Sequence, residues 1–265
     1  KISLLCFILA SFFFLNFIVK KNGLSKDNGY PIFFYLLFIL FFPGIFNNLN
    51  VLYANFFVLL AIRRLISLQS LKASKEKIFD ASFWILIAAL FQFWSILFII
   101  LVYISIIFHV SRDYRNWVLP FIALLGVSSL FLMVSLIFKF DAVTFIQDRA
   151  VIDFRIDYFK DNYENGALSI YVAVALFFVV SMLMTLSNRP QIVHISYKKI
   201  VAYFFIAAVV YIISPDKSND LLLFSIVPLT MMAASHVEYM QQKLNNEIVF
   251  YVLIACSLFT FFSQL

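Results

Sequence analysis

The chain has 265 residues, of which 64% are hydrophobic and only 13% are charged. A soluble domain carries about 25% charged residues, and a water-soluble fold of this size cannot hide so large an apolar share. The composition therefore excludes an ordinary soluble domain and predicts an all-α, polytopic transmembrane helix bundle. The net charge is +6, and the basic residues lie beside apolar segments, as in membrane proteins. We therefore expect membrane lipids as partners and no nucleic acid.

The apolar runs predict about ten membrane spans, because one span needs about 20 apolar residues. In chain order they are Ile2–Val19, Tyr30–Phe46, Val51–Leu68, Phe79–Trp94, Ser95–Val110, Trp117–Phe138, Leu168–Leu186, Ile200–Ser214, Leu221–Met240 and Ile248–Leu265. We expect them to form a single transmembrane domain over residues 1–265. Because Lys1 leads straight into an apolar run, we also expect an N-terminal segment to be missing, either a cleaved signal peptide or a preceding helix.

One apolar run is ambiguous. Phe79–Val110 would be about 48 Å long as one helix, against a hydrocarbon core of about 30 Å. The length favours a hairpin that turns near Gln92–Ser95. No Gly or Pro marks that turn, so a single long tilted helix, and nine spans in all, remains the alternative.

The basic residues divide unequally between the two sides of a ten-span chain. One side receives fourteen of the 20, namely Lys20, Lys21, Lys26, Arg63, Arg64, Lys72, Lys75, Lys77, Arg112, Arg115, Arg189, Lys198, Lys199 and Lys243. The positive-inside rule places that side in the cytoplasm. The other side receives six, namely Lys1, Lys139, Arg149, Arg155, Lys160 and Lys217. The nine-span alternative divides them thirteen to seven, so charge alone does not choose between the two counts.

The longest polar stretch is an outer loop at residues 140–167. Within it Ile152–Tyr158 alternates apolar and polar residues, which places acidic and basic side chains on one face. We interpret the loop as a lid that offers carboxylates to a metal-bound diphosphate or a sugar hydroxyl, or as a solvated loop on the membrane interface whose charges pair with one another. In the first interpretation the candidate catalytic residues are Asp148, Asp153 and Asp157, and Arg149 and Arg155 are candidate ligands of a lipid phosphate.

A second outer segment carries a resemblance. Lys217 precedes the apolar run Leu221–Leu229, which contains Pro228. This pattern resembles the late outer loop of the GT-C superfold of polytopic glycosyltransferases, which use lipid-linked sugars. The resemblance implies that Lys217 faces a lipid phosphate and that a polyprenyl-linked sugar is a partner. That superfold typically has acidic residues in its first outer loop, and this chain has no counterpart of that loop.

A further resemblance covers most of the chain. Ala54–Phe57, Arg63-Arg64, Lys77–Trp84 and Arg115–Trp117 resemble an uncharacterised family of multi-pass inner-membrane proteins from Bacteroidota. The resemblance implies a bacterial inner (cytoplasmic) membrane, with the 140–167 loop in the periplasm. It implies no activity.

Other residues narrow the function only partly. The three His and two Cys have no metal-site spacing, so we expect no metal and no cofactor, and we expect Cys6 and Cys256 to be free thiols. The favoured hypothesis is a GT-C-like protein that handles lipid-linked sugars at the outer face, whether or not it is an enzyme. The alternative is a non-catalytic subunit or scaffold of an envelope complex for secretion, motility or respiration, with other membrane proteins as partners. A transporter ranks last, because no internal repeat is found.

Overall fold

The computed structural model describes residues 2–25, 28–154, 162–188, 191–215, 217–239 and 243–264. It is all-α and 87% helical, with eleven α-helices in the residues described. They are α1 (Ile2–Lys21), α2 (Tyr30–Leu40), α3 (Leu49–Ser67), α4 (Ser74–Phe91), α5 (Ile99–His109), α6 (Arg115–Phe138), α7 (Ala142–Arg149), α8 (Asn162–Thr185), α9 (Gln191–Ile213), α10 (Leu223–Tyr239) and α11 (Lys243–Ser263). Short 3₁₀ helices are η1 (Pro43–Asn47), η2 (Leu68–Ser70), η3 (Phe93–Phe98), η4 (Leu186–Asn188) and η5 (Asn219–Leu222).

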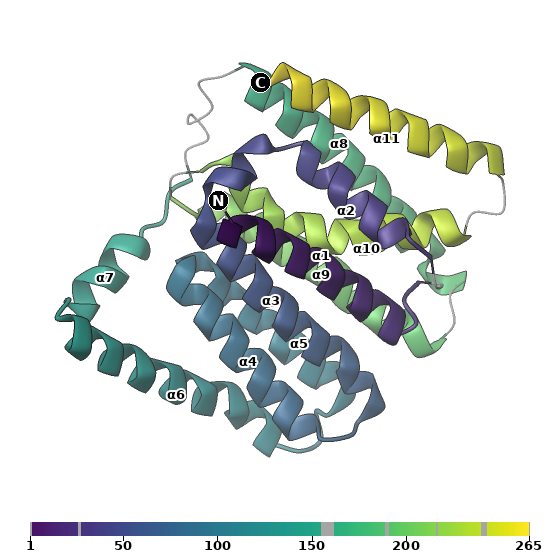
Figure 1. The fold of residues 1–265 in the computed structure, drawn as a ribbon. Coiled ribbons are helices and arrows are strands. Elements are labelled where there is room, and N and C mark those ends of the chain that lie inside the picture. The colour runs from purple at the N-terminus through teal and green to yellow at the C-terminus, as the bar shows by residue number, and fades with distance from the viewer. Residues whose placement is uncertain are drawn as a thin grey trace.

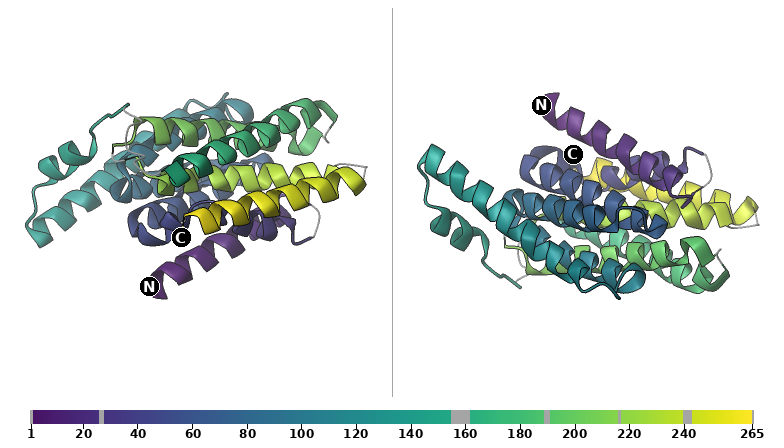
Figure 2. Two further views of the ribbon diagram at one scale, coloured as in Figure 1. Left: turned by 90° about the horizontal axis from the view of Figure 1, so that it is seen from above. Right: turned by 90° about the horizontal axis from the view of Figure 1, so that it is seen from below.

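The long helices lie side by side in one bundle (Figure 1). Helix α10 packs against α2, α3, α8 and α9, and α3 packs against α4. Helix α6 lies at one edge of the bundle, where it contacts α4, and α11 lies at the opposite edge. Together with α7, α6 projects beyond the other helices at one end (Figure 2).

Burial differs sharply between the central and the edge helices. The span that contains α10 is 94% buried, whereas that of α6 is 17% buried. Small residues of α10, among them Ala233, Ala234 and Ser235, let neighbouring backbones approach closely. Helix α6 instead exposes large apolar side chains such as Leu125, Leu136 and Phe138. Such a surface is stable in lipid and costly in water.

Length and composition identify six helices that can cross a membrane. They are Leu4–Lys21, Leu49–Ser70, Arg115–Phe138, Asn162–Thr185, Val193–Ile213 and Asn219–Tyr239, and Tyr30–Leu40, Phe93–His109 and Glu247–Ser263 are shorter apolar helices. Each of the ten predicted segments contains a helix. The prediction of an all-α bundle with several apolar spans is therefore confirmed, while the count of ten spans stays a prediction.

The ambiguous run is two helices. Helix α4 ends at Phe91, Gln92 is extended with φ −129° and ψ 103°, and η3 begins at Phe93. The Gln92 N–H donates to the Ala88 carbonyl, and the Ser95 N–H donates to the Gln92 carbonyl, each at 3.0 Å. Since α4 then packs against η3 and α5, the predicted hairpin is confirmed and the single long helix is wrong.

Two helices begin before the spans predicted for them. The outer loop of residues 140–167 contains α7, and α8 already begins at Asn162. Helix α7 forms because the Asp141 carboxylate caps it by accepting the Val143 N–H at 2.9 Å. The predicted span Ile200–Ser214 belongs to a helix that begins at Gln191. This helix includes Lys199, whose side chain is buried, as described below.

The two ends of the bundle differ in charge. At one end, which we call the cation-rich end, Arg64 pairs with Asp80 at 2.7 Å and Lys75 pairs with Asp113 at 3.3 Å. Lys199 is only 2% exposed there, and its ammonium donates to the Leu65 carbonyl. The opposite end carries the cavity described next, and we call it the cavity end.

Candidate functional site

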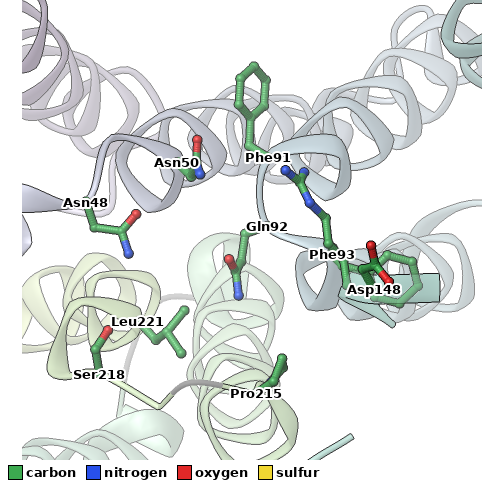
Figure 3. A pocket seen from close by; sticks show the side chains of 10 residues that line it. Asn48, Asn50, Phe91, Gln92, Phe93, Asp148, Pro215, Ser218 and Leu221 are labelled. Carbon is green, nitrogen blue, oxygen red and sulfur yellow. The ribbon is translucent and has the colours of Figure 1, made fainter. Parts of the chain in front are cut away.

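A polar cavity of about 250 Å³ opens at the cavity end of the bundle. Four separate parts of the chain line it: the start of α3, the turn after α4, the end of α7 and the segment before α10 (Figure 3). Its polar lining side chains are Asn48, Asn50, Gln92, Asp148, Arg149 and Ser218. Three amides, a hydroxyl, a carboxylate and a guanidinium thus surround one space.

Helix caps and turns place the amide side chains. Asn48 is the N-cap of α3, and its side-chain oxygen accepts the Val51 N–H at 3.3 Å. The Asn48 amide also bonds the Asp220 carboxylate, to which the Ser218 hydroxyl donates at 3.2 Å. Because one carboxylate joins both residues, the start of α3 and the segment before α10 are held together beside the cavity.

Arg149 fixes α7 against the bundle. Its Nη1 donates to the Leu90 carbonyl at 2.8 Å, and its guanidinium lies 3.8 Å from the centre of the Phe145 ring. An arginine on an aromatic face gains a cation–π attraction. Arginine carries five N–H donors, and the bond to Leu90 takes one of them. The side chain is therefore held in place at the cavity, and the bond to Leu90 leaves other N–H donors on its guanidinium.

Lys217 lies beside the cavity and does not line it. It is 4% exposed, and its ammonium donates to the backbone carbonyl of Asp153. The Asp153 N–H donates to the Ile213 carbonyl at 3.2 Å, and the indole of Trp94 donates to the Val151 carbonyl at 3.0 Å. These bonds attach residues 151–153 to the end of α9 and to η3.

The structure brings some of the predicted site residues together. Asp148 and Arg149 line the cavity, and next to it the Lys217 ammonium donates to the backbone carbonyl of Asp153. Arg155 and Asp157 lie outside the described residues, and so does most of the alternating segment Ile152–Tyr158.

Sequence reasoning missed the amide side chains of this site. Asn48 offered a signal, because an asparagine directly before an apolar helix is a common N-cap. Gln92 interrupts an apolar run. Neither signal says that the two turns lie against α7, because that depends on which helices pack together.

The described residues contain no group of three or more His, Cys, Asp or Glu side chains able to hold a metal ion. Asp148 is the acidic side chain that lines the cavity. The arrangement can bind a ligand with hydroxyl groups and an anionic group, since amides and a carboxylate accept and donate to hydroxyls and a guanidinium binds phosphate.

The six long apolar helices and the exposed apolar surface of α6 define the class, a multi-pass α-helical membrane protein. More particularly, the chain belongs to the DUF6427 family, described as a family of unknown function, whose model matches residues 1–265. No curated protein and no solved structure matches the chain.

Proposed function

We propose that this protein lies in a bacterial inner membrane with its cavity end toward the periplasm, and that the cavity binds the polar head of a lipid-linked sugar. The observation that carries the proposal is the convergence of Asp148 and Arg149 with three amide side chains on one cavity. These residues come from turns that are far apart in the sequence. A loop whose charges only pair in solvent has no need of such a cavity.

Charge supports the orientation. Fourteen of the 20 basic residues belong to the cation-rich end in the ten-span topology, and the positive-inside rule assigns that end to the cytoplasm. The cavity end then faces the periplasm. Polyprenyl-linked sugars in the outer leaflet present their head groups at the periplasmic surface of the membrane.

Size and chemistry support the ligand class. The cavity volume of about 250 Å³ is slightly below the roughly 300–1,000 Å³ of pockets that enclose drug-sized ligands. It therefore suits one head group rather than an oligosaccharide. We assign the phosphate contact to Arg149, whose planar guanidinium suits bidentate binding, and the sugar hydroxyls to Asn50, Gln92 and Asp148.

Lys217 has a supporting role in this proposal. Its buried ammonium holds the Asp153 carbonyl and so positions the segment that follows Arg149. The GT-C resemblance gives the same lysine a phosphate contact. The variant Lys217→Arg separates the two roles. If Lys217 only positions the segment, the larger arginine should disturb the packing around it. If Lys217 binds the phosphate, arginine keeps the positive charge and the protein should still bind.

The experiment measures binding of a polyprenyl-phosphate-linked hexose to the purified protein in phosphatidylcholine nanodiscs. Charge-assisted hydrogen bonds contribute about 1.5–3 kcal/mol, so Arg149→Gln should weaken binding roughly tenfold or more. Arg112→Gln is the matched control, because Arg112 is exposed and lies before α6 at the other end. We expect it to bind like the wild type.

Absence of binding to the wild type, or equal binding by both variants, contradicts the proposal. Either result would favour the alternative, a non-catalytic subunit of an envelope complex. In that case the cavity end is expected to bind a partner protein in the native membrane.

A further inference from the structure

A second cavity adjoins the polar one. It has a volume of about 140 Å³ and an almost wholly apolar lining, and it lies between α4, η3, α6 and α7. We call it the apolar crevice. Phe93 and Arg149 line both cavities, so the two spaces meet at these side chains.

Arg149 marks the boundary between a polar and an apolar space. Its guanidinium is bonded to the Leu90 carbonyl and lies over Phe145, and Leu90 and Phe145 themselves line the crevice. A positive charge held at this boundary matches the position of a phosphate in a lipid, which likewise lies between a polar head and a hydrocarbon chain.

The crevice lies on a side of the bundle that is open to lipid. Helix α6 packs on α4 through a small cluster, Leu86, Ala123 and Val127, that is separate from the main core. The rest of α6 is largely exposed, with 17% of its span buried, and α6 lies at the edge of the bundle (Figures 1 and 2). A lipid can therefore enter from the bilayer without leaving the hydrocarbon layer.

We infer that the two cavities form one site for a phosphorylated lipid, with its phosphate at Arg149, its head in the polar cavity and the first part of its chain in the apolar crevice. The inference rests on the proposed function and adds to it the path of the lipid chain. The crevice contributes position rather than hydrophobic affinity, because a lipid chain is already in hydrocarbon before it binds.

Ser128 provides a specific test. It lines the crevice, it is exposed, and its hydroxyl donates to the Leu125 carbonyl of its own helix. Ser128→Trp should fill the crevice without disturbing the core. Its neighbour Ser129 is the matched control, because it is also exposed, donates to the Gly126 carbonyl of the same helix at 2.8 Å, and does not line the crevice.

Binding is measured in phosphatidylcholine nanodiscs with three probes: a polyprenyl-phosphate-linked hexose, the soluble hexose phosphate and the sugar-free polyprenyl phosphate. Ser128→Trp should weaken binding of both lipid probes at least tenfold and leave binding of the soluble probe within twofold of wild type. Ser129→Trp should stay within twofold for all three probes.

The outcomes separate the two proposals. Full binding of the lipid probes by Ser128→Trp, with sensitivity to Arg149→Gln retained, overturns the chain path and leaves the proposed function standing. Binding of the sugar-free lipid alone, lost in Ser128→Trp, supports the crevice and contradicts the sugar head group. Failure of the wild type to bind any lipid probe overturns both.

Discussion

Asp220, which bonds the cavity-lining residues Asn48 and Ser218, makes a close contact with Gly44 that a single methyl group should break. A Cβ added at Gly44 in η1 would lie 2.7 Å from the Asp220 carboxylate oxygen Oδ1, about 0.7 Å short of the 3.4 Å at which ordinary contact begins. The carboxylate cannot simply turn away, because the Ser218 hydroxyl and the Asn48 amide bond it. Gly44→Ala must therefore strain the backbone or break these bonds.

The expected cost follows from overpacking. Added methyl groups in a packed site typically cost about 1–3 kcal/mol, which corresponds to a fall in melting temperature of roughly 2–8 °C for a chain of this size. The assay is thermal unfolding of the purified protein in detergent. Gly126→Ala is the control, because a Cβ there meets nothing within 4 Å and alanine is about 0.5–1 kcal/mol better than glycine in a helix.

A double-mutant cycle tests the cause. Asp220→Ala alone should destabilise by about 1 kcal/mol through its lost hydrogen bonds. In the double variant the added methyl meets no carboxylate, so Gly44→Ala should then cost almost nothing, a coupling of about 1–3 kcal/mol. Additive effects, or a Gly44→Ala variant as stable as Gly126→Ala, would refute the reasoning.

Two further predictions concern the cation-rich end. Lys199→Met should raise the melting temperature, because the Leu65 carbonyl keeps the Leu68 N–H and no buried charge remains; a fall larger than that of the exposed control Lys198→Met would contradict this. The pKa of Asp113 is lowered by the Arg115 backbone N–H, and further by Lys75. A lowered folded-state pKa gives stability above the unfolded value of about 4 that is lost as the pH falls. Asp113→Asn should therefore melt below wild type at pH 7, by a margin that narrows as the pH falls below about 4, and a margin that does not change with pH would rule out this explanation.

The helices themselves could be predicted because each depends on its own sequence. In hydrocarbon every backbone N–H and C=O must bond within its segment, so an apolar run of sufficient length forms a helix whatever its neighbours are. The hairpin at Gln92 followed from the same argument, since Phe79–Val110 is too long for one span.

The start of α9 was missed for a reason that sequence does not reveal. Lys198 and Lys199 directly precede the predicted span Ile200–Ser214 and were therefore counted with the cytoplasmic loop before it. Lys199 is buried because the Leu65 carbonyl of α3 and the His109 Nε2 of α5, the latter at 3.2 Å, meet its ammonium. Only the packing of three helices shows that these partners are present.

Only some residues of the candidate site could likewise be predicted from the sequence. Asp148 and Arg149 were found because charges in an outer loop of a membrane protein are noticeable, and the Asp141 cap could have revealed α7 as well. Asn48, Asn50 and Gln92 belong to other turns of the same end. Topology places all these turns on one side of the membrane, but their adjacency follows from α3 and α4 packing together and from the Arg149–Leu90 bond that holds α7 against them.

The solvent also decides which part of the site can discriminate between ligands. Removing an apolar group from water contributes roughly 25 cal/mol per Å², but a lipid chain that moves from the bilayer into the apolar crevice leaves no water. If the proposed site is correct, differences in affinity between lipids must come from the polar cavity, where amides, Asp148 and Arg149 would replace water around the head group. Substitutions at Asn50 and Gln92 should accordingly change which head group binds, whereas substitutions in the crevice should change binding of all lipids alike.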